Sequence, residues 1–184
     1  MSRSHPEKSV DRRNFLRASL ATLIAGGSAS AQAQDDSRRL ALFGLHTREF
    51  LDVEYFRDGA YVPSALAQID HALRDHRENE STHIDLALLN LLHALSTSLN
   101  TREPFRFLSG YRTQKTNDAL RAAGRGVAKN SYHVHGRAID ILPPGVPLAD
   151  LVFAANMAQV GGVGQYTRRG FVHLDTGPVR HWVR

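Results

Sequence analysis

The 184-residue sequence contains no cysteine. This absence excludes disulfide bonds, zinc sites built from thiolates and a cysteine nucleophile, and it also excludes a lipid carried by an N-terminal cysteine. Any metal bound by this chain must therefore be held by histidine and carboxylate side chains.

A strong charge of one sign is also missing once the N-terminus is set aside. The chain carries a formal net charge of +5, but residues 1–33 hold five of its basic and two of its acidic residues, which leaves +2 for the rest. So small an excess forms no extensive basic surface, and we expect no nucleic-acid partner.

Apolar runs of the roughly 20 residues that span a bilayer are missing as well, so no stable membrane span is expected. The 42% of hydrophobic residues nevertheless suffices for the core of one ordinary domain.

The N-terminus has the features of an export signal. Residues 11–17 read DRRNFLR and resemble the twin-arginine motif, in which paired arginines precede Phe-Leu and a basic residue. A mildly apolar run over 18–25 follows, and small residues then offer cleavage sites near 31–33. A membrane anchor is the alternative, but the run is too short and too rich in Ala, Gly and Ser. We predict a cleaved signal over 1–33 and a periplasmic domain over 34–184, exported through the twin-arginine pathway.

The rest of the chain predicts an α+β fold with a small antiparallel sheet and flanking helices. Short apolar runs predict strands, and apolar residues at helical spacing predict helices. The expected strands are residues 40–45, 50–56, 105–108, 137–142, 163–166 and 171–176. The expected helices are residues 64–77, capped by Ser64, and residues 85–99, 113–123 and 148–159. Short turns within the first and last pairs of strands predict two hairpins.

The richest cluster of chemically active side chains lies at residues 131–140. His133 can offer an imidazole nitrogen and Asp140 a carboxylate, and Gly136 between them permits a bend that brings the two together. Asp140 is charged within an otherwise apolar run, where a carboxylate must be paired or bound to a cation. The alternative is a solvent-facing aspartate near a strand end and a histidine bonded to the backbone.

A third metal ligand is expected in the strand at residues 171–176. Alternation puts Phe171, His173 and Asp175 on one face of this strand, so that His173 and Asp175 point toward the same site. Three protein ligands would leave a fourth position open for water, which is typical of catalytic rather than structural zinc sites.

The signature Ser-x-His-x-x-Gly-x-Ala-x-Asp is matched by Ser131, His133, Gly136, Ala138 and Asp140. It resembles that of the D-Ala-D-Ala peptidase and Hedgehog-type zinc peptidases, and within this group the branch of periplasmic murein endopeptidases. Further blocks carry the resemblance through most of the chain: residues 45–47, 109–112, 125–129, 161–164 and 171–182. The resemblance implies the fold of these zinc peptidases and a Zn²⁺ ion held by His133, Asp140 and His173.

The same resemblance implies a zinc-dependent endopeptidase that hydrolyses peptide cross-links of peptidoglycan, with links between two diaminopimelate residues as the expected target. Zinc would polarise the scissile carbonyl and lower the pKa of a bound water toward roughly 7. Arg112 matches an arginine that these enzymes place near the substrate, where it would stabilise the oxyanion or bind a substrate carboxylate. A structural ion pair is the alternative role for Arg112.

The general base is not where many of these relatives carry it. Gly170 and Phe171 stand three and two residues before His173, and neither side chain can accept a proton. Asp175 is the first replacement candidate, although it could instead hold a histidine ligand in its correct tautomer. His181 is the second candidate base. We interpret the remaining histidines of the predicted domain over 34–184 as structural or surface residues: His46, His71, His76, His83, His93 and His135.

Two other functions remain open on the sequence. The first is a D,D- or L,D-carboxypeptidase that trims stem peptides, and the second is a non-catalytic, zinc-bearing module that binds the cell wall. Cleavage of a cross-link needs a groove open at both ends, whereas trimming needs a pocket closed at one end. The sequence does not show which of these two shapes the site has.

Overall fold

Residues 36–184 are the part of the chain that the computed structural model describes, and they contain eight strands, four α-helices and two short 3-10 helices. The strands are β1 (Arg38–Gly44), β2 (Phe50–Arg57), β3 (Ala60–Tyr61), β4 (Phe105–Ser109), β5 (Ala138–Leu142), β6 (Gly162–Tyr166), β7 (Phe171–Asp175) and β8 (Arg180–Val183). The helices are α1 (Pro63–Ala72), α2 (Leu86–Ser98), α3 (Gln114–Ala122), η1 (Tyr132–His135), α4 (Leu148–Ala158) and η2 (Thr167–Arg169). The predicted signal peptide over 1–33 and its boundary lie outside the described residues.

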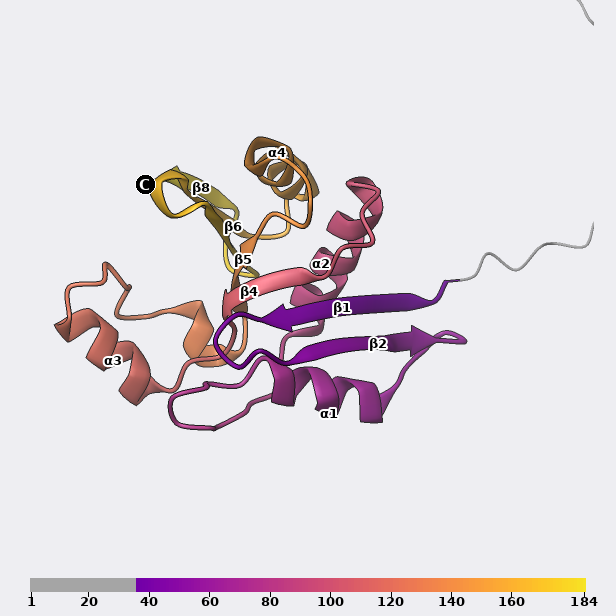
Figure 1. Ribbon diagram of the computed structural model, residues 1–184, viewed down its shortest axis with the longest axis horizontal. Coiled ribbons are helices and arrows are strands. Elements are labelled where there is room, and N and C mark those ends of the chain that lie inside the picture. Colours follow the sequence, from indigo (N-terminus) through magenta and orange to yellow (C-terminus); the bar gives the residue numbers. More distant parts are fainter. Residues whose placement is uncertain (1–35) are drawn as a thin grey trace, which may run out of the picture. The chain divides into compact units, whose positions relative to one another are not determined.

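All eight strands join one sheet in the order β3-β2-β1-β4-β5-β7-β6-β8. Figure 1 shows β1 lying between β2 and β4. The α+β class is confirmed, and the sheet is mostly antiparallel as predicted, but the prediction that it is small is wrong. The sheet is large, and the pairs β1–β4 and β6–β8 run parallel. Parallel partners are joined by long crossovers, so a sequence pattern that reports each strand by itself does not show them. The edge strands β3 and β8 are too short or too polar to stand out in the sequence.

Both predicted hairpins are confirmed. β1 pairs antiparallel with β2 through a turn closed by the Arg48 N–H, which donates to the Gly44 carbonyl at 2.8 Å. β6 pairs antiparallel with β7 across η2, and Gly170 ends this connection with a φ of 68°. A residue with a Cβ rarely adopts such a φ, so the glycine is required by the turn itself.

The helices begin and end where local chemistry allows. The predicted helix over 85–99 is α2, and the Asp85 side chain caps it, because Asp85 Oδ1 accepts the Ala87 N–H at 2.9 Å. The predicted start and end of the first helix are wrong. Pro63 opens α1 without a side-chain cap from Ser64, and the helix ends at Ala72. The predicted extension to residue 77 fails because the Asp75 N–H bonds to the Glu80 carbonyl instead of continuing the helix. None of the helices within residues 36–184 is long and apolar enough to cross a membrane.

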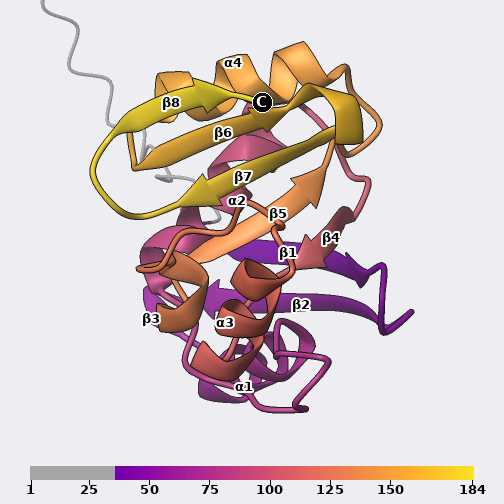
Figure 2. The same ribbon diagram turned by 90° about the vertical axis from the view of Figure 1, so that its left-hand side faces the viewer.

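The two faces of the sheet differ in what covers them. Helices α2 and α4 lie behind the sheet in Figure 2, and α3 lies in front of it. The buried face carries an apolar core that includes Leu92 of α2, Ile139 of β5 and Leu174 of β7. Because side chains alternate along a strand, the neighbours Asp140 and His173 emerge on the opposite face. The core therefore determines which face carries the polar side chains.

Candidate active site

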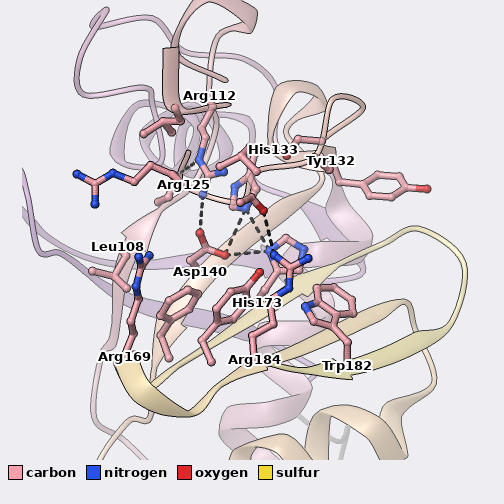
Figure 3. A pocket seen from close by; sticks show the side chains of 18 of the residues that line it. Leu108, Arg112, Arg125, Tyr132, His133, Asp140, Arg169, His173, Trp182 and Arg184 are labelled. Atoms are coloured by element: carbon pink, nitrogen blue, oxygen red, sulfur yellow. Dashed lines mark hydrogen bonds and ion pairs between the residues drawn. The ribbon is translucent and has the colours of Figure 1, made fainter. Parts of the chain in front are cut away.

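Asp140 and His173 meet because β5 and β7 are paired antiparallel and these two residues are direct partners. Asp140 Oδ1 lies 2.9 Å from His173 Nδ1 (Figure 3). Strand alternation correctly predicts that the His173 side chain turns away from the apolar neighbours Val172 and Leu174, which are fully buried.

His133 reaches the same place from η1, the short helix that precedes β5. Gly136 ends η1 with a φ of 65°, so the predicted bend between His133 and Asp140 is present. A Cβ atom at this glycine would lie 2.5 Å from the His83 carbonyl oxygen, which leaves no room for a larger residue.

Hydrogen bonding fixes the orientation of the His133 ring. His133 Nδ1 donates to the Gly110 carbonyl at 2.7 Å, because a carbonyl oxygen can only accept. His133 Nε2 is then the nitrogen without a proton, and it lies 3.2 Å from His173 Nδ1 and 3.3 Å from Asp140 Oδ1. Three potential ligand atoms therefore face one point.

These three atoms have the spacing of a metal site. They lie at 2.9, 3.2 and 3.3 Å from one another, and ligand atoms bound at 2.0–2.2 Å in a tetrahedral site are separated by roughly 3.3 Å. His133 and Asp140 are buried, and His173 is partly buried. The predicted ligand residues are thus brought together in a form that could hold a metal ion.

The pKa shifts of the three residues favour the binding of a cation. Burial lowers the pKa of His133 to about 4, so that its ring is neutral near pH 7, as a metal ligand must be. Burial would raise the pKa of Asp140, but the adjacent His133 and His173 hold it well below its usual range. Burial likewise opposes protonation of His173, yet hydrogen bonds with Asp140 and Asp175 raise its pKa to about 8. A bound cation would replace the proton that His173 holds.

Asp175 lies on the other side of the His173 ring. Its Oδ2 atom is 2.9 Å from His173 Nε2, and its side chain is fully buried. Asp175 Oδ1 accepts the N–H groups of Gly162 and Gly177, and Arg180 contacts both carboxylate oxygens at 2.6 and 3.0 Å. Burial would raise the pKa of Asp175, but the bonds from His173 and Arg180 lower it, so the carboxylate remains ionised.

Arg112 is bonded to a residue of the cluster. Arg112 Nη2 lies 2.5 Å from Asp140 Oδ2, and Arg112 Nε donates to Ser109 Oγ at 2.7 Å. The two oxygens of the Asp140 carboxylate therefore have different partners: Oδ2 faces the guanidinium, and Oδ1 faces the two histidines. Arg112 also lines the adjoining pocket, so the ion pair and a contact with substrate are compatible.

The turn that carries Arg112 is attached to the segment after α1. The carboxylate of Asp75 accepts both the N–H of Thr113 at 2.9 Å and its hydroxyl at 3.1 Å. A Cβ atom at Gly110 would lie 2.6 Å from the Leu73 carbonyl oxygen, so the turn and this segment are in close contact. Gly110 thus serves both this contact and the bond to His133.

A pocket of about 580 Å³ opens over the cluster. Among the described residues that line it, Asp140 is the only one with a carboxylate side chain, whereas arginines come from several segments. Trp182 of β8 lines the pocket, and alternation along β8 turns the exposed His181 to the opposite face. His181 is therefore not brought to the cluster.

His46 is a pocket residue, although the sequence predicted a structural or surface role for it. It lies in the turn between β1 and β2, lines the pocket and stacks on His76 with 4.5 Å between ring centres. Its place within the block of residues 45–47 that carries the family resemblance was the available signal. Arg169 and Arg184 also line the pocket, and no sequence motif distinguishes them.

Glycines of β6 make room for the side chains of β8. A Cβ atom at Gly162 would lie 2.6 Å from Arg180 Nη1, and one at Gly164 would overlap the ring of Trp182. Arg180 can therefore reach Asp175, and Trp182 can lie 5.4 Å from the His173 ring.

Known proteins that resemble this chain have one name in common. The profile of the family described as peptidoglycan L,D-endopeptidase MepK matches residues 32–182. The peptidoglycan L,D-endopeptidase MepK of Escherichia coli strain K12 is 46% identical over 145 residues, which are 79% of this chain and 80% of that protein. A protein of Haemophilus influenzae, named probable peptidoglycan L,D-endopeptidase MepK, is 37% identical over 161 residues, or 86% of this chain and 87% of that protein. Because the match extends over most of the sequence, the chain belongs to the MepK family of peptidoglycan L,D-endopeptidases.

Proposed function

We propose that this chain is a zinc-dependent endopeptidase of peptidoglycan that hydrolyses the cross-link between two diaminopimelate residues. The observation that carries the proposal is the convergence of His133 Nε2, Asp140 Oδ1 and His173 Nδ1 under an open pocket. The names of the related proteins support the substrate, because a bond from the L-centre of one diaminopimelate to the D-centre of another is an L,D link.

The donor atoms favour zinc. Two imidazole nitrogens and one carboxylate oxygen form a frequent catalytic zinc set, and such a set leaves a coordination position for water or substrate. When bound, zinc would polarise the scissile carbonyl and acidify a water molecule. The protein's part is to hold His133, Asp140 and His173 in place before the metal arrives.

Each ligand has a partner that supports this orienting role. The Gly110 carbonyl holds His133, and Arg112 holds the second oxygen of Asp140. Asp175 acts in the same way on His173, since its carboxylate contacts the ring nitrogen that faces away from the cluster. We therefore assign Asp175 the orienting role of the two that the sequence left open.

Hydrolysis also needs a group that accepts a proton from the attacking water and returns one to the leaving amine. Buried Asp175 and outward-facing His181 are poorly situated for this task. His46 is, outside the three ligands, the one histidine among the described residues that line the pocket. An imidazole can accept and return a proton near neutral pH, so we assign this role to His46.

Peptidoglycan lies outside the cytoplasm, so this function requires export. The twin-arginine motif at residues 11–17 supports transport through that pathway and action in the periplasm. The substrate would be the stem peptides of the cell wall.

The test uses the mature protein and purified muropeptides. Dimers linked through two diaminopimelates should fall to monomers, and a chelator should stop the reaction until zinc is restored. His133→Ala should lower zinc content at least tenfold and abolish cleavage. His135→Ala is the matched control, because His135 lies on the same short helix but is exposed and does not line the pocket.

Each contrary result has a separate meaning. Shortened stem peptides with intact dimers would identify a carboxypeptidase. Binding to peptidoglycan without any cleavage would identify a wall-binding module. Full zinc content in His133→Ala would exclude the proposed ligand set.

A further inference from the structure

Four arginines from three separate segments surround one end of the active-site pocket. Together with Tyr166 they line an adjoining hollow of about 460 Å³: Arg125 after α3, Arg168 and Arg169 of η2, and Arg184 at the C-terminus. Arg125, Arg169 and Arg184 line both this hollow and the larger pocket (Figure 3). We call these three residues the arginine subsite.

Hydrogen bonds of the C-terminal arginine tie together the segments that form the hollow. The Arg184 N–H donates to the Gln165 carbonyl at 2.8 Å, and the Arg184 carbonyl accepts the Thr167 N–H at 2.9 Å, which ties the C-terminal residue to the end of β6. Arg184 Nη1 donates to the Gly126 carbonyl at 3.0 Å and so joins the loop that carries Arg125. These bonds hold the end of β6, the C-terminal residue and the loop after α3 together around the hollow.

The positive charge of this region is balanced only in part by the protein. Two other arginines that line the larger pocket are paired, Arg112 with Asp140 and Arg180 with Asp175. Within residues 36–184, by contrast, no ion pair involves the arginine subsite or Arg168, and no Asp or Glu lines the hollow. The lining residues carry four guanidinium groups but one carboxylate, the α-carboxylate of Arg184, whose oxygen accepts bonds from Thr167. Clustered guanidinium groups repel one another in water, and an anion that bridges them relieves this repulsion. Their planar forks match a carboxylate.

We propose that the arginine subsite binds a free carboxylate of the diaminopimelate next to the scissile bond. This inference rests on the proposed function. Diaminopimelate has two carboxyl groups. In this link the donor residue gives the carboxyl of its L-centre, whereas the acceptor residue gives the amine of its D-centre and keeps the carboxyl on that same centre, next to the scissile bond. The subsite lies beside the predicted metal ligands in one continuous pocket, so such a carboxylate can bind there while the link reaches the cluster.

The test compares two substrates that differ in one group. The first is a diaminopimelate-linked dimer with free carboxylates, and the second carries carboxamides at the same positions. Arg169→Gln and Arg184→Gln should each lower kcat/KM for the carboxylate substrate about tenfold, since a bond to a charged partner is lost. The same variants should change kcat/KM for the carboxamide substrate less than about twofold. Arg102→Gln is the control, because Arg102 is exposed and lines neither pocket nor hollow.

Binding to the metal-free protein gives a second measurement that needs no activity. Isothermal titration calorimetry should show about tenfold weaker binding of the carboxylate dimer by Arg184→Gln than by the unaltered chain, and equal binding of the carboxamide dimer. A third dimer, amidated only at its glutamate, should bind like the first. Weaker binding of that dimer would move the recognised carboxylate to glutamate and overturn the assignment.

Failure of this inference differs from failure of the proposed function. Equal losses on both substrates, or no loss on either, would reject the subsite while cleavage by the unaltered chain still supports the endopeptidase. If no dimer is cleaved, the proposed function fails, and the calorimetric comparison decides the subsite alone.

Discussion

Asp175 illustrates how one buried carboxylate can control a residue that faces a reaction site. It accepts a bond from His173 Nε2 and also holds two backbone N–H groups and Arg180. This arrangement directs His173 Nδ1 toward Asp140 and His133 and fixes the tautomer of the ring.

Asp175→Asn should therefore weaken zinc binding. The amide can still fill the space, but it loses the charge that orients His173, and we expect zinc affinity to fall by about 10- to 100-fold. Competition with a fluorescent zinc chelator measures this change. Asp58→Asn, at an exposed position, should leave the affinity unchanged. Unchanged zinc affinity together with a loss of turnover of roughly 100-fold would instead identify Asp175 as the general base.

His46→Ala should lower kcat by about 100-fold or more while zinc content stays normal, because the proton acceptor is removed but no ligand is touched. Cleavage assays on cross-linked dimers, quenched at fixed times, measure kcat, and metal analysis measures the zinc content. His76→Ala controls for the lost ring stack with His46, and His181→Ala controls for the alternative base. If His181→Ala shows the larger loss of turnover, the assignment of His46 is incorrect.

At the scale of elements, the turn after β4 connects the N-terminal half of the chain to the site. Asp75, which follows α1, accepts bonds from Thr113 and from the Arg77 N–H at 3.0 Å, and Arg112 directly precedes Thr113. The position of the arginine that holds Asp140 therefore depends on a carboxylate distant in sequence.

Asp75→Asn should lower the free energy of unfolding by about 1–3 kcal/mol near pH 7, because a buried acceptor is replaced by a group that cannot accept all of these bonds. Burial would raise the pKa of Asp75, but its hydrogen bonds lower it below the ordinary value. The unfolded chain then binds a proton before the folded chain does, so this stabilisation is present above about pH 4 and is lost as the pH falls further. Urea titrations of both metal-free proteins, followed by Trp182 fluorescence, should show the difference shrinking below pH 4. A constant difference down to pH 2 would contradict this role.

At the scale of the whole molecule, the pocket is assembled from both halves of the sheet. His46 comes from the β1–β2 turn, His133 from η1, and Trp182 from the last strand. The parallel pairs β1–β4 and β6–β8 bring these distant segments to one face.

The whole molecule must also reach its substrate. Arg12→Lys combined with Arg13→Lys should leave the protein in the cytoplasm, since the paired guanidinium groups are what the export machinery is expected to recognise. Fractionation and immunoblotting measure the periplasmic share. Arg38→Lys with Arg39→Lys alters another arginine pair, beyond the predicted cleavage site, and should be exported normally. Normal periplasmic delivery of the first double variant would exclude a twin-arginine route.

Sequence patterns by themselves predicted the two hairpins, the helix that begins near Asp85 and the three proposed ligand residues. These features depend on short stretches of chain. Gly136 allows a bend between His133 and Asp140, and strand alternation directs His173, so local spacing was sufficient.

The tertiary structure alone decided which groups surround these three residues. Arg112 pairs with Asp140, Asp175 lies behind His173, and His46 and Arg184 line the pocket, all through contacts between segments far apart in the chain. Such contacts follow from which strands pair and in which direction. A sequence pattern reports the period of each strand but not its partner, because strand pairing depends on burial and packing across the whole sheet.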